Sequence, residues 1–339
     1  MTYNIIKKLP FISRLIADRD RLLGEREKLL GERKRLMNEL DRLIHEKDLL
    51  SDELSVFTQA RLFVPPGHYY SPIPSIQDIK KHENRTLKKI PKKIPGIDLR
   101  EKEQLNLLNI FKPLYDEIPF HCEKTDDLRY HFENPAYSYS DAIFLYCMIR
   151  KFTPKKIIEV GSGYSSCVSL DTNELYFNNK IKTTFIEPYP DLFLSLIKPG
   201  DTSRISLIPN NLQEVSLDVF SALEKNDILF IDSTHVAKVD SDVTYIFSEI
   251  LPVLAPGVFI HFHDIFFPFE YCREWIFENR AWNEIYLLKA FLAYNSSFEI
   301  VLFNTFLDHF HKDSLKKNMP LCLKNPGGSI WLQKTKKNV

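Results

Sequence analysis

Hydrophobic side chains near the N-terminus recur with a period of seven residues. One row consists only of leucine, and a second apolar residue follows it at nearly every repeat. The leucine row is Leu15, Leu22, Leu29, Leu36, Leu43 and Leu50, and the second row is Ile16, Leu23, Leu30, Met37 and Ile44. Charged residues fill most of the remaining positions. A heptad pattern of this length predicts a long helix that pairs with other helices as a coiled coil.

The apolar stripe of this helix is narrow. The row that usually completes a coiled-coil seam contains Arg26, Arg33 and Lys47, and Gly24 and Gly31 each cost about 1 kcal/mol relative to alanine. The helix therefore depends on a partner for stability. A solvated single helix and a helix docked on its own domain remain as alternatives. Acidic and basic side chains alternate on the polar face, which disfavours a helix lying on a membrane surface.

Prolines interrupt the pattern between residues 57 and 95, and lysine and arginine cluster there. This composition predicts a linker or extended arm. Its basic cluster suits anionic lipid or a phosphorylated substrate, or simply forms a solvated connector. The aromatic stretch PPGHYYSPIPS at 65–75 is a candidate lid, with anchoring to a domain surface as the alternative. We predict four parts: a coiled-coil helix at 1–56, this linker at 57–95, a helical extension or lid at 96–137, and an α/β domain at 138–339.

Short apolar runs alternate with helical patterns in the C-terminal part. Strands are predicted at 157–160, 183–186, 205–208, 228–231, 258–262, 298–303 and 329–332. Helices are predicted at 99–117, 138–151, 189–198, 212–225, 241–254 and 272–293. This alternation predicts a doubly wound, mostly parallel sheet.

Composition and charge exclude several classes of protein. Lysine plus arginine equals aspartate plus glutamate at 45 each, so no global field attracts nucleic acid. The five cysteines are widely spaced and lack CxxC pairs, which predicts reduced thiols and a cytoplasmic location. The apolar run near the N-terminus is too short for a signal peptide or a membrane span.

The stretch IIEVGSGYSS at residues 157–166 joins the first predicted strand to a helix. Gly161 and Gly163 would let a ligand approach the backbone closely, because a Cβ would block it. The third glycine of a dinucleotide fingerprint is absent, which argues against a pyrophosphate ligand. A tight turn without a ligand is the alternative.

Acids and histidines follow the later strands. Glu187 ends the second strand 24 residues after Gly163, where an acid can accept hydrogen bonds from ribose hydroxyls. The motifs DILFIDSTH (227–235) and GVFIHFHDIFF (257–267) place further polar groups at the edge where open α/β sheets bind ligands. These groups are Asp232 and His235 after the fourth strand, and His261, His263 and Asp264 at the fifth.

The glycine turn reads E-x-G-x-G, and with the acids that follow it resembles motif I and its partners in the class I S-adenosylmethionine (SAM) methyltransferases. The resemblance covers about the last 200 residues. It implies a Rossmann-like, doubly wound α/β fold, with a mostly parallel seven-stranded sheet and a final antiparallel strand. It also implies SAM as the cofactor. The implied cofactor-binding residues are Glu159, Gly161, Gly163, Tyr139, Glu187, Asn211 and Asp232. Asn210, Gln213 and Asp141 are further candidates to border that pocket.

Methyl transfer to a hydroxyl needs a base that removes its proton or a metal that lowers its pKa. Histidine suits the first role, and we predict His235, with His263 second, beside Asp232 as catalytic groups. Asp232, His263 and Asp264 are the predicted metal ligands, in resemblance to metal-dependent O-methyltransferases. The pair His263-Asp264 departs from the Asp-Asn pair of those enzymes, and imidazole is a poor ligand for Mg²⁺. Histidines that only orient the aspartates are the alternative.

The aromatic segment IFFPFEYCREW at 265–275 is a candidate wall for the acceptor, or a cap on the core. Together with DSTHVAKVDSDV it resembles a group of bacterial SAM methyltransferases associated with glycan and surface-polysaccharide synthesis. The resemblance implies an O-methyltransferase that acts on a sugar or glycan hydroxyl, as an oligomer formed through the N-terminal helix. A coiled-coil scaffold with a degenerate Rossmann domain and a hydroxylase-like relative of the same fold are the alternatives.

Overall fold

The computed structural model describes residues 10–59, 63–88 and 90–336. The chain divides into two compact units, Met1–Ser75 and Ile76–Val339. Predictions that concern residues 1–9, including the start of the N-terminal helix, and Lys89 of the basic cluster lie outside the described residues.

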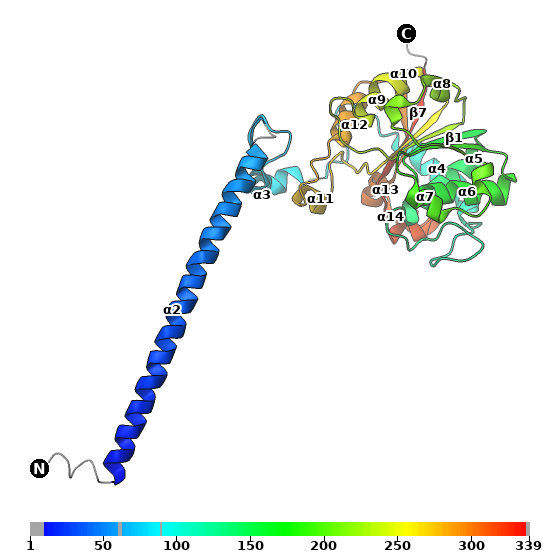
Figure 1. Cartoon of the computed structure of the whole chain (residues 1–339). Helices are drawn as coiled ribbons and strands as arrows, with labels where there is room; N and C mark the ends of the chain where they lie inside the picture. The colour runs from blue at the N-terminus through cyan, green and yellow to red at the C-terminus, as the bar shows by residue number, and fades with distance from the viewer. Residues whose placement is uncertain (1–9, 60–62, 89, 337–339) are drawn as a thin grey trace, which may run out of the picture. The chain divides into compact units, whose positions relative to one another are not determined.

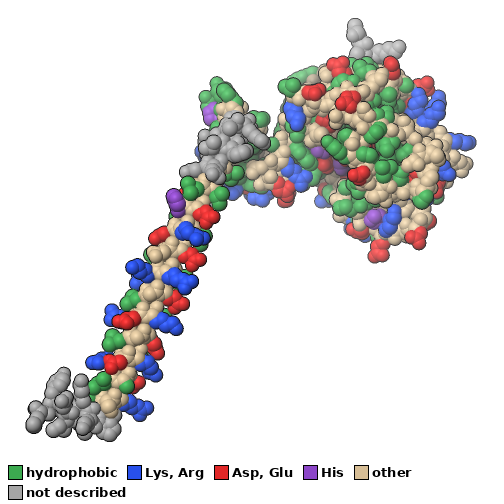
Figure 2. Space-filling model, viewed as in Figure 1, with side chains coloured by type: hydrophobic (Ala, Val, Ile, Leu, Met, Phe, Trp, Pro, Cys, Tyr) green, Lys and Arg blue, Asp and Glu red, His purple; other side chains and the backbone are tan. Residues whose placement is uncertain are grey.

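A single long helix, α2 (Pro10–Gln59), makes up most of the first unit (Figure 1). The predicted long helix is therefore confirmed. Its leucine row is exposed, with Leu29 at 64% and Leu36 at 61% of full exposure. Acidic and basic side chains alternate along the same helix (Figure 2). Pairing of this helix as a coiled coil stays a prediction.

The aromatic stretch after α2 folds on itself. Gly67 has a φ of +83° and its backbone N–H donates to the carbonyl oxygen of Ile73 at 3.0 Å, which closes a loop. The rings of His68 and Tyr69 stack with centroids 4.2 Å apart, and Tyr69 is 4.3 Å from Tyr70. Coverage of an active site by this stretch stays a prediction.

The second unit begins with helix α3 (Ile76–Thr86), where an extended arm was predicted. The prolines of the linker lie on both sides of this segment and none lies within it. Asp78 in the first turn and Arg85 in the last turn complement the helix dipole. Arg273 also forms an ion pair with Glu83 of α3 at 2.9 Å. Residues 76–86 of the predicted linker or extended arm are thus helical, and the role of residues 57–95 as a linker stays a prediction.

Seven strands form one sheet in the order β3-β2-β1-β4-β5-β7-β6. Their bounds are β1 (Lys156–Val160), β2 (Lys182–Ile186), β3 (Ser206–Ile208), β4 (Ile228–Ile231), β5 (Phe259–His263), β6 (Phe298–Phe303) and β7 (Ser329–Lys334). The first five strands pair in parallel, and β7 runs antiparallel to both of its neighbours. This confirms the predicted seven-stranded α/β sheet with a final antiparallel strand.

Helices cover both faces of the sheet (Figure 1). One face carries α4 (Glu101–Tyr115), α5 (Tyr139–Phe152), α6 (Tyr164–Phe177), α7 (Asp191–Leu196), α13 (Asn304–Phe310) and α14 (Lys312–Asn318). The other carries α8 (Leu217–Ser221), α9 (Asp242–Tyr245), α10 (Leu251–Val253) and α12 (Glu284–Leu292). Short elements complete the unit: α11 (Arg273–Phe277), η1 (Asp201–Ser203), η2 (Leu212–Glu214), the π-helical η3 (Ile246–Ile250) and η4 (Pro320–Leu323).

Several predicted helices are broken. The pattern at 241–254 divides into α9, η3 and α10, where Pro252 has no backbone N–H to donate. The pattern at 272–293 is two helices, α11 and α12, and the pattern at 212–225 contains only η2 and α8. Helices α13 and α14 were not predicted. The segment between α11 and α12 faces the candidate active site.

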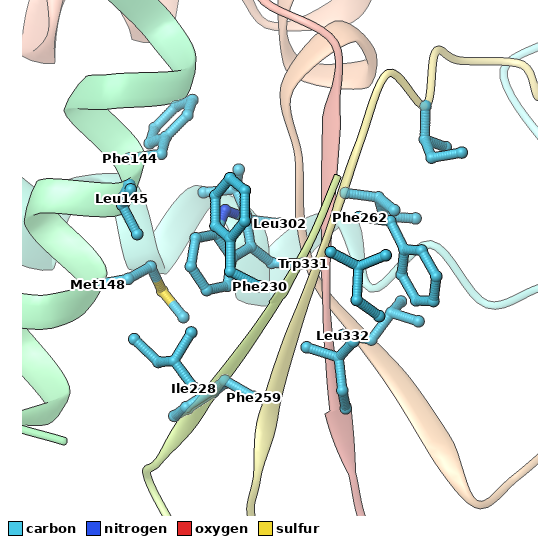
Figure 3. Packing of buried hydrophobic residues seen from close by; sticks show 14 of the residues in the cluster. Phe144, Leu145, Met148, Ile228, Phe230, Phe259, Phe262, Leu302, Trp331 and Leu332 are labelled. Atoms are coloured by element: carbon cyan, nitrogen blue, oxygen red, sulfur yellow. The ribbon is translucent and has the colours of Figure 1, made fainter. Parts of the chain in front are cut away.

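The core lies between the sheet and α5 (Figure 3). Phe230, Phe259 and Trp331 project toward α5, whereas Phe262 and Leu332 project to the opposite face. Side chains alternate between the two faces because the period of a strand is two residues. On the opposite face, Phe262 packs against the ring of Phe247 in η3.

A buried ion network attaches the segment between α4 and α5 to the domain. The guanidinium of Arg129 donates to Asp171 of α6 at 2.6 Å and to Asp201 of η1 at 2.6 and 2.7 Å. Asp171 also accepts the backbone N–H of Tyr130 at 2.8 Å. Arg129 is 2% exposed, so each of these charges is compensated by its partners rather than by water.

Candidate active site

A cavity of about 440 Å³ opens at the carboxyl ends of the parallel strands. Gly161 after β1, Glu187 after β2, Asn211 and Gln213 after β3, and Asp232 after β4 line it. Another side is formed by Lys238, Asp240, Ser241 and Asp242. The structure thus brings four of the predicted cofactor-binding residues, Gly161, Glu187, Asn211 and Asp232, to one cavity. Their roles toward a ligand stay predictions.

The two glycines of the turn differ in what the fold demands of them. Gly161 has a φ of +77°, and a Cβ there would lie 2.3 Å from the carbonyl oxygen of Asp232. Glycine is therefore required at this position by the packing of the turn against the end of β4. Gly163 is extended, and a Cβ would meet nothing closer than Leu192 at 3.8 Å. Contacts within the described residues do not require glycine at position 163, and its role toward a ligand stays a prediction.

Glu159 is fully buried beneath the turn. Its Oε1 accepts the hydroxyl protons of Ser165 at 2.5 Å and Ser166 at 2.8 Å. Its Oε2 has no hydrogen-bond partner among the described residues. Burial raises the pKa of this carboxyl to about 8, although the two serine hydrogen bonds act in the opposite direction. A buried oxygen without a partner calls for one, and an ammonium group of a ligand would favour the ionised carboxylate as its acceptor.

Glu187 lies beside the glycine turn on the cavity wall. Its carboxylate accepts the backbone N–H of Ser162 at 3.2 Å and that of Tyr189 at 2.8 Å. This geometry links the ends of β1 and β2 and leaves the acid on the cavity wall. Gln213 donates to the carbonyl oxygen of Asp240 at 2.5 Å, while Asn210 and Asn211 both turn toward Glu214.

Tyr139 and Asp141 at the start of α5 are not among the residues that line the cavity. The hydroxyl of Tyr139 contacts Glu133, and Lys324 donates to it at 3.1 Å. Asp141 is buried, and Ser329 of β7 donates to it at 2.6 Å. These contacts attach α5 to its surroundings, and the predicted contacts of both residues with a cofactor stay untested.

A second cluster adjoins the cavity at Asp232. Nε2 of His235 lies 3.5 Å from Asp232 Oδ1 and 3.6 Å from Asp264 Oδ2. On the other side of the ring, Nδ1 donates to Oε2 of Glu284 at 2.8 Å. His235 and Glu284 are 5% and 1% exposed. Sequence reasoning missed Glu284, because it lies 49 residues after His235 on a different element and belongs to no motif.

The charges around His235 control its protonation. Burial by itself lowers the pKa of His235, but the contacts with Asp232 and Glu284 outweigh burial and raise this pKa to about 10. Burial raises the pKa of Asp264, while the neighbouring His263 and His235 lower it. Asp232 keeps a lowered pKa because the nearby histidines outweigh its burial. At neutral pH the resting cluster therefore holds an imidazolium between two carboxyl groups.

The backbone at this cluster is strained. His235 has a φ of 60° and Asp264 a φ of 55°, in the left-handed region that costs a residue with a Cβ about 1 kcal/mol or more. Two such residues whose side chains lie 3.6 Å apart are held there by the surrounding fold. Strain of this kind is concentrated at functional sites.

The two histidines of β5 differ in environment. His263 has its Nε2 3.5 Å from Asp264 Oδ1, and its Nδ1 lacks a hydrogen-bond partner among the described residues. His261 is fully buried, stacks on Phe230 with centroids 4.0 Å apart and packs edge-on against Trp331. Burial keeps the pKa of His261 well below its usual range. The expectation that His261 reaches the sheet edge is wrong, because it lies inside β5 among core rings.

The predicted metal ligands do not fit a divalent cation in this arrangement. Within the part of the chain that the structure describes, no group of three or more His, Cys, Asp and Glu side chains has a geometry that would hold a metal ion. Nε2 of His235 lies 3.5 Å from Asp232 and 3.6 Å from Asp264, so an imidazole already contacts both carboxylates. The set Asp232, His263 and Asp264 stays a prediction that this geometry does not favour.

Aromatic side chains extend from His235 toward the surface. The ring of Trp282 lies 4.4 Å from that of His235 and 5.2 Å from that of Trp275. Phe266 packs edge-on against Trp275, and the guanidinium of Arg280 lies 4.4 Å from the Trp275 ring. We call Phe266, Trp275 and Trp282 the aromatic wall. Phe267, by contrast, packs against Phe303, Phe306 and Phe310 in the core.

A family model for a methyltransferase domain matches residues 158–265, from β1 to the residue after Asp264. This match covers the glycine turn, Glu187, Asp232, His235 and the end of β5, whereas Glu284 lies beyond it. This chain belongs to the class I SAM-dependent methyltransferases.

The methyltransferase also has a curated relative, an uncharacterized protein of Archaeoglobus fulgidus, with 33% identity over 179 residues, covering 51% of this chain and 80% of the relative. Among solved structures it is similar to a methyltransferase from Podospora anserina bound to S-adenosylhomocysteine (SAH). The identity is 13% and the TM-score 0.41, and the match covers 78% of this chain and 99% of that methyltransferase. It is also similar to an O-methyltransferase from Streptomyces achromogenes involved in tomaymycin synthesis. The identity is 14% and the TM-score 0.38, and the match covers 68% of this chain and 90% of that enzyme. These likenesses are too remote to transfer ligands or activities to this chain.

Proposed function

We propose that this methyltransferase methylates a hydroxyl group of a sugar or glycan, with His235 as the base. The observation that supports this proposal is the position of Asp232. It lines the cavity at the glycine turn and also lies 3.5 Å from Nε2 of His235. A methyl donor in that cavity and a methyl acceptor beside His235 would therefore both lie next to the Asp232 carboxylate.

SAM suits the cavity because Glu187 lies on its wall and Glu159 is buried beneath the glycine turn. Glu187 would accept hydrogen bonds from the ribose, and Glu159 Oε2, which has no partner among the described residues, would pair with the ammonium group of SAM. SAM supplies an electrophilic methyl group. Calorimetry tests the fit: Glu187→Ala should weaken SAM binding on the order of tenfold or more, as expected for loss of hydrogen bonds to a charged acceptor. Absence of wild-type binding at millimolar SAM would favour the scaffold alternative.

In the proposed step, the acceptor hydroxyl lies between the cavity and His235. Nε2 takes the hydroxyl proton as the oxygen forms its bond to the methyl carbon, while the carbon–sulfur bond breaks and its electron pair stays on sulfur. Asp232 and Asp264 stabilise the imidazolium that results, since both lie within 3.6 Å of Nε2. We leave the predicted divalent cation out of this step because the imidazole itself lies between the two carboxylates. His263 is the weaker base candidate, since its Nε2 contacts only Asp264.

The aromatic wall is the proposed binding surface for the acceptor. Sugars pack their C–H faces on aromatic rings, and Trp282 joins this surface to His235 with ring centroids 4.4 Å apart. Trp275→Ala should raise the KM for the acceptor and leave the affinity for SAM unchanged. Mass spectrometry of the product identifies the reaction: gain of one methyl group supports it, whereas gain of one oxygen would identify the hydroxylase-like alternative.

We further propose that α2 joins copies of this chain as a coiled coil. Its leucine row is more than half exposed at Leu22, Leu29 and Leu36, and a second copy of the same row would cover it. Deletion of residues 1–56 should reduce the assembly to a monomer in sedimentation, and an unchanged mass would refute the pairing. The basic linker suits peripheral contact with anionic membranes, to be tested with vesicles.

A cytoplasmic location completes the proposal. The five cysteines are all free thiols, as expected in a reducing compartment. Searched over the described residues, the helices include none that is long and apolar enough to cross a bilayer.

A further inference from the structure

Residues just before α12 and at its start form hydrogen bonds with the backbone of His235. The backbone N–H groups of Asn283 and Glu284 both donate to the carbonyl oxygen of His235, at 3.0 and 3.1 Å. The side-chain amide of Asn283 accepts the N–H of Ala237 at 2.6 Å and donates to its carbonyl oxygen at 3.3 Å. Trp282 lies against the imidazole ring itself. These contacts define where the backbone of His235 stands.

The side chain of Glu284 then defines how the His235 ring is turned. Its Oε2 accepts the hydrogen bond from Nδ1 at 2.8 Å, so Nε2 must face Asp232 and Asp264 on the opposite side of the ring. In a neutral imidazole one nitrogen carries the proton and the other holds a lone pair. A carboxylate at Nδ1 keeps the proton there, because a carboxylate only accepts.

We propose that Glu284 is a positioning residue for methyl transfer, which holds His235 with its proton on Nδ1 and its lone pair on Nε2, directed at the acceptor. This inference rests on the proposed function of His235 as the base. Glu284 is not among the residues that line the cavity, and it acts through the ring of His235. A base with the wrong nitrogen toward its substrate cannot take the proton, as is known for the carboxylate–histidine pairs of hydrolases.

Burial makes a purely structural role costly. Glu284 is 1% exposed, and removing a carboxylate from water costs several kcal/mol unless partners compensate it. Its Oε1 has no hydrogen-bond partner among the described residues, so His235 supplies the strong contact of this side chain. A favourable position at the N-terminus of α12 would stabilise an exposed acid by less than 1 kcal/mol or so. An amide or apolar side chain would pack here at lower cost.

The test compares Glu284→Gln and Glu284→Ala in the full-length enzyme. We expect kcat measured on the plateau near pH 10, where His235 is neutral in wild type, to fall on the order of a hundredfold in Glu284→Ala, the scale of a general base, with KM for SAM and for the acceptor unchanged. Glu284→Gln still offers an oxygen to Nδ1 and should recover part of the loss. In a His235→Ala background, Glu284→Ala should cause no further loss, because the two act as a unit.

A spectroscopic signature needs no substrate. The Nδ1 proton of His235, held by a carboxylate, should give a far-downfield proton resonance in ¹⁵N-histidine-labelled wild-type enzyme. The resonance should move in Glu284→Gln and disappear in Glu284→Ala. The matched control is Asp227→Asn, which also removes a buried carboxylate but at the amino ends of the strands, where it accepts the N–H of Lys155 and Lys156. It should lower stability and leave kcat unchanged.

The outcomes separate the two proposals. If wild type transfers a methyl group and His235→Ala abolishes transfer while both Glu284 variants keep kcat within twofold, the positioning role is wrong and the proposed function stands. An equal loss from Glu284→Ala with and without His235 would also overturn it, in favour of a structural role. If wild type transfers no methyl group, the proposed function fails, and this role fails with it even if the resonance is observed.

Discussion

The clearest consequence of the cluster around His235 is an alkaline pH profile. A base must be neutral to take a proton, and the contacts with Asp232 and Glu284 raise the pKa of His235 to about 10 against the effect of burial. At pH 7.5 that leaves about 0.3% of the ring neutral, from a difference of roughly 2.5 units. The kcat/KM should therefore rise about tenfold per pH unit from pH 7 to 9 and level off near pH 10.

The assay is kcat/KM for SAM from initial rates, because this constant reports the free enzyme. The kcat/KM for the acceptor at saturating SAM reports the enzyme with the donor bound. The positive charge of SAM beside Asp232 disfavours the imidazolium, so this second profile should level off at lower pH. Glu284→Gln removes one carboxylate and should likewise move the rise to lower pH, with a reduced plateau. A profile that is flat or falls between pH 7 and 9 would refute His235 as the base.

The same shift has a consequence for stability. Because the pKa of His235 is higher in the folded state than in the unfolded chain, the stabilisation is fully present below about pH 6.5 and is lost as pH rises to about 10. Its size is on the order of a few kcal/mol. Urea unfolding should show this fall in the free energy of unfolding for wild type and a smaller one for His235→Gln. Equal pH dependence in both would contradict the raised pKa.

Further predictions concern other parts of the chain. Gly161→Ala should abolish SAM binding in calorimetry and destabilise the fold, because the new Cβ would lie 2.3 Å from a carbonyl oxygen. The control is Gly200→Ala, which has a similar positive φ but open space around it and should bind SAM normally. Arg129→Met should cost about 3–5 kcal/mol in urea unfolding by leaving buried carboxylates unpaired; a loss below 1 kcal/mol would refute that view of the network. Leu29→Glu with Leu36→Glu should dissociate the assembly in sedimentation, and an unchanged mass would argue against pairing through α2. Excess EDTA should leave methylation within twofold, whereas loss of activity that Mg²⁺ restores would show that a cation takes part.

The local pattern of the sequence was sufficient for α2 and for the strands of the sheet, but not for α3, α13 and α14. The heptad of α2 and the apolar runs of the five parallel strands are patterns of neighbouring residues, so these elements can be predicted without knowing any contact between distant segments. The edge at which Asp232, His235 and Asp264 gather was also predictable, because the carboxyl ends of parallel strands share one edge. The ends of the elements were less predictable, because η3 and the break between α11 and α12 depend on packing rather than on periodicity.

The chemistry inside that edge was decided by the tertiary structure. Strand alternation directs His261 and His263 to the same face, but only the positions of Phe230 and Trp331 show that His261 is a core ring. Glu284 reaches His235 from another helix, and no spacing rule relates them. The sequence by itself thus determined a sheet, a glycine turn and a row of acids. Contacts between distant segments decided which nitrogen of His235 faces Glu284 and which faces Asp232 and Asp264, because hydrogen-bond partners depend on three-dimensional placement.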